Sequence, residues 1–338
     1  MTYNKNYQVD SAEVYCSIHS VVNTGAGISN FVLAALSNGE VIPECFFGGT
    51  NNRTHLYYHD KISIDKEHEH SIDIDQAYLS HIVYWGNFYH FMLELFPNLY
   101  YYSKNLMSSG VKLIIPDTNL LILELLDVLN IPESLVIVGE PKCLYRINKL
   151  HYSSTKTEPG DTQSQIDAFR HLQSAFTDID CASSPERLYI SRQDKKNKKF
   201  NNSANSEERK IINDDDVLQT IKKFNYDTQT VGTKSFYEKA KLLSRTRHIV
   251  TPHGGNILNC CLAKNLETIT ILTCKHALFC DNIFEKFIRA MLPNTKVIFV
   301  KGDQPENPNG EHLYSRIPFN VPVSELEESL QNEHDAQI

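Results

Sequence analysis

The chain lacks the features that define several large classes of protein. It has 33 Lys and Arg against 41 Asp and Glu, a net charge of −8, so a basic surface for nonspecific nucleic-acid binding is missing. None of its eight cysteines forms a C-x-x-C pair, and they are too widely spread for a small disulfide framework. The glycine-rich loop of P-loop phosphotransferases is also absent. We therefore expect reduced thiols and no nucleic-acid partner.

The chain also has no long uninterrupted apolar run. Its most apolar segment, residues 82–102, contains Asn87, His90, Glu94 and Asn98, which a bilayer core would not tolerate. Residues 1–10 are polar and resemble no signal peptide. We expect a cytoplasmic protein in which residues 82–102 are buried in the core. Peripheral contact with the inner face of a membrane stays an alternative, although no basic amphipathic helix indicates it.

Short β-branched runs alternate with helical patterns along the 338 residues, and this alternation predicts an α/β protein with parallel sheets. The length suggests two domains. A polar segment at residues 177–186 predicts the boundary between domains 1–178 and 179–338. The expected strands are 112–115, 135–138, 149–152, 187–191, 228–231, 248–251, 268–272 and 297–300. The expected helices are 119–129, 163–176, 215–224 and 235–244. Residues 65–75 are interpreted as a surface loop, and the acidic tail from residue 325 as a surface helix.

The first polar cluster lies in the aromatic segment at residues 85–97. Helical spacing places His90 and Glu94 on one face, four residues apart. A carboxylate beside a histidine raises its basicity, which suits a general base. The alternative is a core histidine that is merely hydrogen-bonded.

The second cluster follows a predicted strand. Ser191 and Arg192 come at its carboxyl end, where parallel sheets bind ligands, and a guanidinium can grip a diphosphate with two hydrogen bonds. Arg209 could add a second phosphate contact, just before Asn213 and Asp214. Surface ion pairs are the alternative for both arginines.

Three consecutive acidic residues, Asp214, Asp215 and Asp216, allow two interpretations. A D-x-D metal site is one. We favour the other, in which Asp caps a helix N-terminus and complements its dipole.

The third cluster is a glycine turn between a predicted strand and a predicted helix. Glycines let the backbone approach a ligand closely, and a helix N-terminus presents N–H groups to phosphate. An ordinary turn is the alternative. The residues are Pro252, His253, Gly254, Gly255 and Asn256, followed by Asn259.

Together these clusters resemble the glycosyltransferase 61 family over roughly residues 80–275. That family has an aromatic segment with His-Phe and Glu, matched at residues 88–94, and an Ile-Ser-Arg strand, matched at 190–192. It also has an arginine-rich stretch before Asn-Glu, matched at 209–214, and a Pro-His-Gly turn with a nearby Asn, matched at 252–259. Two residues depart from the pattern: Asp214 stands where Glu is more usual, and Lys210 replaces the second arginine.

The resemblance implies a GT-B fold, two Rossmann-like domains with a donor cleft between them, and a metal-independent, inverting hexosyl- or pentosyltransferase. The N-terminal domain would bind the acceptor, a glycan or lipid-linked saccharide in surface polysaccharide synthesis. His90 would be the base, oriented by Glu94, with Glu94 itself as second choice. The C-terminal domain would bind a nucleotide sugar, expected to be UDP-linked, without other cofactors. Its donor contacts would be Ser191, Arg192, Arg209, Asn213, Asp214, His253, Gly254, Gly255, Asn256 and Asn259. A catalytically inactive protein that binds a nucleotide sugar or a glycan stays an alternative.

Overall fold

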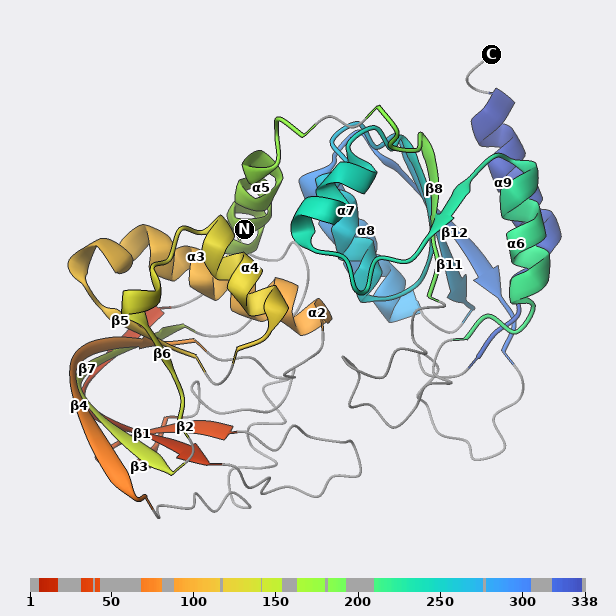
Figure 1. Cartoon of the computed structure of the whole chain (residues 1–338). Helices are drawn as coiled ribbons and strands as arrows, with labels where there is room; N and C mark the ends of the chain where they lie inside the picture. The colour runs from red at the N-terminus through yellow and green to blue at the C-terminus, as the bar shows by residue number, and fades with distance from the viewer. Residues whose placement is uncertain are drawn as a thin grey trace. The chain divides into compact units, whose positions relative to one another are not determined.

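A computed structural model divides the chain into two compact units, Met1–Ala168 and Phe169–Ile338 (Figure 1). The boundary falls inside helix α5 (Gln163–Ala175), ahead of the polar segment that the sequence suggested. The part of the chain that the structure describes comprises residues 6–17, 32–38, 40–42, 68–80, 88–115, 118–140, 142–153, 163–179, 182–192, 210–275, 278–304 and 318–335.

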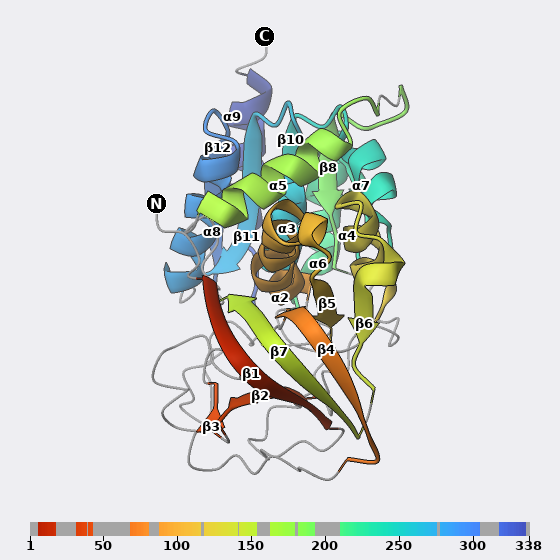
Figure 2. The ribbon, with the colours of Figure 1, turned by 90° about the vertical axis from the view of Figure 1, so that its left-hand side faces the viewer.

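The first unit is built on a mixed, seven-stranded sheet in the order β3-β2-β1-β7-β4-β5-β6. Strands β7, β4, β5 and β6 are parallel to one another, whereas β1 is antiparallel to both β7 and β2. Figure 2 shows β1, β7 and β4 side by side. The strands are β1 (Asn6–Ser17), β2 (Val32–Ser37), β3 (Glu40–Val41), β4 (His70–Leu79), β5 (Lys112–Ile115), β6 (Val136–Val138) and β7 (Cys143–Ser153).

Chain order in this sheet reverses between β4 and β7, because β5 and β6 follow on one side of β4 and β7 returns on the other. Helices α3 (Phe96–Asn105) and α4 (Leu120–Val128) cover one face (Figure 1). Side chains on the opposite face, including Val14, Leu79 and Tyr152, form an apolar core cluster. A parallel sheet with a reversal of this kind is the frame on which α/β proteins place ligands.

One prediction for this unit is wrong. Residues 65–75 were expected to form a surface loop, but β4 begins at His70 and pairs in parallel with β7 over most of its length. Four of its first five residues are exposed, and only Ile74 among them is buried. The apolar pattern by which a strand is recognised is therefore absent there, while the backbone ladder is formed.

The second unit contains a five-stranded, fully parallel sheet in the order β12-β11-β10-β8-β9. This is a doubly wound order, and chain order reverses between β8 and β10. The strands are β8 (Arg187–Ile190), β9 (Asp227–Gln229), β10 (His248–Pro252), β11 (Thr268–Cys274) and β12 (Lys296–Gly302). All seven residues of β11 are buried, as expected for an interior strand of a sheet covered on both faces.

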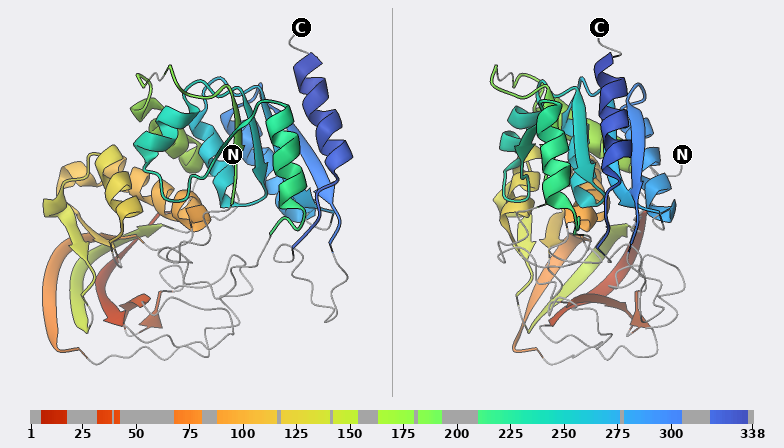
Figure 3. Two further views of the ribbon diagram at one scale, coloured as in Figure 1. Left: turned by 45° about the vertical axis from the view of Figure 1, so that its right-hand side comes forward. Right: turned by 90° about the vertical axis from the view of Figure 1, so that its right-hand side faces the viewer.

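Helices cover both faces of this sheet. Figure 3 shows α6 (Asp214–Lys223) and α9 (Val323–Asp335) side by side on one face, and both supply side chains to one core cluster, including Ile221 and Leu330. Helices α7 (Phe236–Leu243) and α8 (Leu278–Met291) lie on the other face (Figure 1). The acidic tail does form a helix, but α9 is more than a surface helix, because Leu326, Leu330 and Glu333 are buried.

The strands and helices expected from residue 112 onward are present within a few residues of their predicted bounds, except that β7 begins earlier, at Cys143. The described part of the chain contains no helix long and apolar enough to cross a bilayer.

Candidate functional site

The first unit places His90 and Glu94 in direct contact, as their spacing predicted. His90 Nδ1 and Glu94 Oε1 are 2.6 Å apart, and the side chains are 8% and 0% exposed. His90 ends the short helix α2 (Phe88–His90), and the ring of Tyr89 meets the imidazole edge-on at 5.2 Å. A buried carboxylate is costly unless it is paired, so the contact with His90 helps to stabilise Glu94 in the core.

Glu94 lies in a single wide turn of π-helix, η3 (Phe91–Leu95), between α2 and α3. The wide turn has a local cause. Pro97 has no N–H for the carbonyl of Leu93, and its ring would clash with that carbonyl in a regular α-helix. The backbone N–H of Phe96 instead donates to Phe91, and Gln165 Nε2 donates to the Leu93 oxygen at 3.0 Å. Such π-turns are frequent at functional sites.

The pair has the geometry of an oriented general base. An ionised Glu94 accepts the Nδ1–H of His90, which leaves Nε2 as the acceptor nitrogen of a neutral imidazole. The carboxylate also stabilises the imidazolium that forms when Nε2 takes a proton. The arrangement can therefore remove a proton from a hydroxyl group that reaches Nε2.

The second unit brings Arg192 and His253 together between β8 and β10, where the chain order of the strands in its sheet reverses. Arg192 follows β8, His253 follows β10, and these two strands are neighbours. Arg192 Nη1 donates to the main-chain oxygen of His253 at 2.9 Å, and the backbone N–H of His253 donates to Leu272 at 2.8 Å. The guanidinium is therefore held at the carboxyl ends of the two strands, where open α/β sheets bind ligands.

The glycine turn after β10 is confirmed in position, and its helix is of the 3₁₀ type. Gly254 has φ of 148° and ψ of −173°, a conformation that favours glycine, and Gly255 begins the 3₁₀-helix η7 (Gly255–Leu262). Gly255 and Asn256 are half-buried, whereas His253 is 7% exposed and its ring packs edge-on against Phe284 at 5.0 Å.

Two polar side chains beside this turn are almost fully buried. Asn259 Nδ2 donates to the oxygen of Asn256 at 3.0 Å, which closes the first turn of η7. Its Oδ1 has no hydrogen-bond partner among the residues that the structure describes. Ser191, at the end of β8, donates its backbone N–H to Gln229 at 2.8 Å and so extends the ladder to β9.

Asn213 and Asp214 stand at the start of α6. Both ends of the Asn213 amide are engaged by the backbone of Val321, at 2.9 Å each, so in this structure Asn213 links α6 to the segment before α9. Asp214 lies close to Tyr189: burial chiefly, and then the Asp214 carboxylate, raise the pKa of that phenol, whereas Arg192 lowers it. Asp214 and Arg192 therefore both flank Tyr189, a residue that sequence analysis did not single out.

The three acidic residues lie in the first turn of α6, where they complement its dipole as expected. The prediction that an Asp caps this helix is wrong. Asn213 occupies the N-cap position, and its side chain makes no capping hydrogen bond. No group of three His, Cys, Asp or Glu in the described ranges could hold a metal ion. Arg209 lies outside the described residues.

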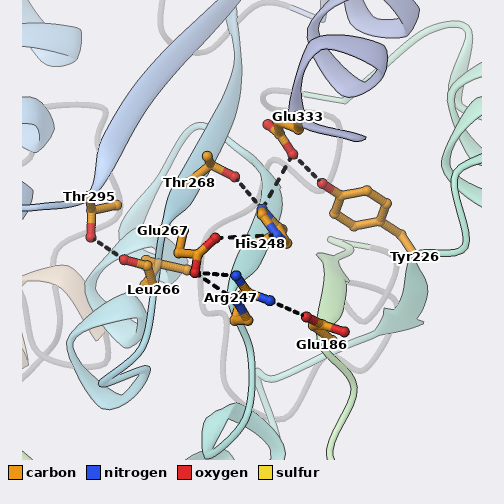
Figure 4. Close-up of polar contacts among 9 residues, drawn as sticks. All are labelled: Glu186, Tyr226, Arg247, His248, Leu266, Glu267, Thr268, Thr295 and Glu333. Atoms are coloured by element: carbon orange, nitrogen blue, oxygen red, sulfur yellow. Dashed lines mark hydrogen bonds and ion pairs between the residues drawn. The ribbon is translucent and has the colours of Figure 1, made fainter. Parts of the chain in front are cut away.

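A second polar cluster lies at the opposite edge of the same sheet, where β8, β10 and β11 begin (Figure 4). It borders a pocket of about 550 Å³. Its charges are largely paired with one another: Arg247 binds Glu186 and Glu267, each at 2.7 Å, and Glu333 accepts hydrogen bonds from Tyr226 and Thr270. The pocket is lined by Arg247, His248, Glu267, Thr268, Lys296, Asn332 and Glu333.

We expect this cluster to make the folded protein less stable as the pH falls. His248 is 2% exposed, and burial lowers its pKa below the usual 6.5; Arg187 and Arg247 also lower the pKa, while Glu333 and Glu267 oppose the shift. The unfolded chain then takes up a proton first as the pH drops below about 6.5, and folding stability is lost. Melting temperatures measured between neutral and mildly acidic pH test this prediction.

His248→Asn is the informative variant, because a side-chain amide can replace the hydrogen bond between His248 Nδ1 and Thr268 at 2.8 Å. Its melting temperature should depend less on pH than that of the wild type. The same substitution at the exposed His70 is the control. Equal pH dependence in the wild type and His248→Asn would contradict the prediction.

A parallel, doubly wound sheet with an arginine held at its point of reversal defines an α/β unit of the ligand-binding kind. Comparison with known families is more specific. Residues 88–270, more than half of the chain, match the glycosyltransferase 61 family, and the protein belongs to that family. No curated protein matches the chain. The protein is thus a glycosyltransferase by family, and the match covers the His90–Glu94 pair and the Arg192–His253 contact.

Proposed function

We propose that the protein transfers a hexosyl or pentosyl group from a nucleotide sugar to a saccharide acceptor, with inversion at the anomeric carbon and without a metal ion. The observation that carries the proposal is the hydrogen bond from Arg192 to the His253 main chain at the reversal of the second unit's sheet. Two units with parallel strands and a reversal in each sheet are compatible with the GT-B architecture, to which we extend the proposal.

The second unit would bind the donor. As the glycosidic bond breaks, negative charge develops on the departing nucleoside diphosphate, and fixed cations and N–H groups lower the barrier without reorganising. Arg192 supplies the cation, and the Gly254–Gly255 turn supplies N–H groups at the start of η7. Ser191, Arg209, Asp214, Asn256 and Asn259 complete the proposed donor contacts, while Asn213 would have to exchange its bonds to Val321 to join them.

The first unit would bind the acceptor and remove its proton. Direct displacement needs a base on the face of the sugar opposite the leaving group. His90 Nε2 fits that role because Glu94 holds the other ring nitrogen at 2.6 Å. The acceptor we propose is a glycan or lipid-linked saccharide of surface polysaccharide synthesis, modified in the cytoplasm or at the inner face of the membrane.

A thermal-shift screen tests the donor. The purified protein is heated with UDP, GDP, CMP, dTDP and their common sugar conjugates, with and without EDTA. Because a ligand that binds the native state raises the melting temperature by mass action, we expect a selective shift with UDP and a UDP-sugar. The shift and the transfer activity should both survive EDTA.

The control is adenosine monophosphate, which shares the phosphate but not the expected base. Loss of both shift and activity with EDTA, restored by Mg²⁺ or Mn²⁺, would return Asp214, Asp215 and Asp216 to consideration as a metal site. No shift with any nucleotide would contradict the donor assignment and favour a glycan-binding protein.

A further inference from the structure

The reversal in the first unit's sheet offers a second ligand position. It lies between β4 and β7, whose carboxyl ends are neighbours in the parallel ladder. Ser80 follows β4 directly, and its backbone N–H donates to Ile114 at 3.1 Å, so the extended pairing continues through this residue. By the rule that places ligands beyond the carboxyl ends at a reversal, Ser80 borders a binding position.

The helix that covers this edge can be placed by its aromatic contacts. The Tyr78 ring lies 6.0 Å from that of Tyr101 and 5.8 Å from that of Tyr102, so α3 packs on the face of β4 that carries Tyr78 (Figure 1). Alternation along an extended chain puts Ser80 on the same face as Tyr78.

Asn98 lies on the matching face of α3, one helical turn before Tyr102. A helix that connects parallel strands runs back along the sheet, so the step from Tyr102 to Asn98 leads in the same direction as the step from Tyr78 to Ser80. Asn98 and Ser80 therefore occupy corresponding positions, one on the helix and one on the strand. Glu94 and His90 lie four and eight residues before Asn98 on the same continuous helical segment.

Both side chains are buried without a complete set of hydrogen bonds. Ser80 is 0% and Asn98 2% exposed, and neither Ser80 Oγ nor Asn98 Oδ1 has a hydrogen-bond partner in the described part of the chain. His151 pairs with Tyr78 across the ladder and lies on the same face. Its Nε2 also has no hydrogen-bond partner in the described part of the chain. An unsatisfied buried polar atom is costly in a folded protein and calls for an explanation.

Two hydroxyl groups at the same edge, those of Tyr78 and Ser153, do have hydrogen-bond partners. The hydroxyl groups of Tyr78 and Ser153 are 2.7 Å apart, and Ser153 donates to Asn6 at 2.5 Å. The edge is therefore able to pair polar groups within the protein, yet Ser80 Oγ, Asn98 Oδ1 and His151 Nε2 have no hydrogen-bond partner among the described residues. A bound molecule with several hydroxyl groups would supply donors to both.

We propose that Asn98 and Ser80 bind hydroxyl groups of a neutral saccharide and position it along the helix that carries His90 and Glu94. This inference rests on the proposed function, in which the first unit binds the acceptor. The contacts offered are an amide oxygen and a hydroxyl group, and the ionisable pair on the same helix is bonded to itself, so neutral sugars fit better than acidic ones. With a rise of 1.5 Å per residue in the α-helix and less in the π-turn, Asn98 and His90 are separated by roughly 10–12 Å along the helix, so the saccharide has more than one sugar ring.

Calorimetric titration of the full-length protein with cellobiose, lactose, maltose and xylobiose, without a nucleotide sugar, tests the proposal. At least one disaccharide should bind the wild type, and Asn98→Leu should weaken that binding roughly tenfold, because a sugar hydroxyl loses its acceptor. Ser80→Ala should weaken it by a similar factor. Asn105→Leu is the matched control on the same helix, at an exposed position whose amide bonds to Tyr101.

The melting temperature is a second readout. If Asn98 had only a structural role, Asn98→Leu would lower the melting temperature. If Asn98 is kept for binding, Asn98→Leu should melt at the same or a higher temperature than the wild type. A lower melting temperature, unchanged disaccharide binding in Asn98→Leu, or no binding by the wild type would each overturn the proposal. Failure of the donor screen with disaccharide binding intact would instead reject the transferase function and leave this site standing.

Discussion

Replacing His90 by alanine should reduce sugar transfer by roughly 10²–10⁴-fold while leaving nucleotide-sugar binding unchanged, because a positioned general base contributes about that factor. The reason lies in the geometry of the pair. His90 Nδ1 lies 2.6 Å from Glu94 Oε1, and a carboxylate that accepts the Nδ1–H leaves Nε2 as the nitrogen that can take a proton. The rate is measured as kcat at saturating donor, and donor affinity is measured separately by calorimetry.

Because Glu94 is completely buried, replacing His90 by alanine also removes a hydrogen-bond partner of this carboxylate, and stability has to be controlled. His90→Asn serves this purpose, since its side-chain amide can donate to Glu94 in place of Nδ1–H but cannot act as a base. The exposed pair of His70 and Glu140, 3.2 Å apart, provides a matched histidine for the same two substitutions. Transfer that persists in a folded His90→Asn protein would move the base to Glu94 or to another residue.

Arg192→Ala should weaken binding of the nucleoside diphosphate by roughly 10- to 150-fold and lower kcat as well, since a charged hydrogen bond is worth about 1.5–3 kcal/mol. The guanidinium is held at the reversal of the second sheet by the carbonyl of His253, 2.9 Å away. Arg192→Lys should recover only part of the loss, because an ammonium keeps the charge without the planar fork.

Arg289→Ala is the matched control, because Arg289 is an exposed arginine on α8 paired with Glu285 on its own helix. Arg192→Ala also removes the hydrogen bond to the main chain of His253. A melting curve of this variant shows whether the loss of that bond destabilises the fold, and so separates this effect from the loss of the phosphate contact. Unchanged affinity for the diphosphate in a folded Arg192→Ala protein would reject the phosphate role. Binding without turnover in the wild type would point to an inactive member of the family.

Periodicity in the sequence was a good guide wherever burial follows a regular local pattern. The run at residues 268–272 is rich in β-branched residues, and it lies in β11, the fully buried strand beside β10. His90 and Glu94 are four residues apart in an aromatic segment, and that spacing alone predicted their contact. In both cases the information lies within one turn or one strand.

The beginning of β4 shows why other elements could not be recognised from local pattern. Its first residues are mostly polar and exposed, so the segment lacks an apolar face, and its strand conformation depends on backbone pairing with β7, more than 70 residues later. Glu333 is a similar case. It belongs to an acidic tail, yet it is buried because Tyr226 and Thr270 donate to its carboxylate from other elements.

The sequence by itself determined which residues are chemically able to act: the imidazole–carboxylate pair, the arginine after a strand, and the glycine turn. Only the tertiary structure decided how they are arranged. Arg192 contacts His253 because β8 and β10 are neighbours at a reversal of chain order, and α3 lies on the face of β4 that carries Tyr78 because the helix returns across that strand. Strand order depends on contacts between distant segments, and such contacts leave no periodic signal in the chain.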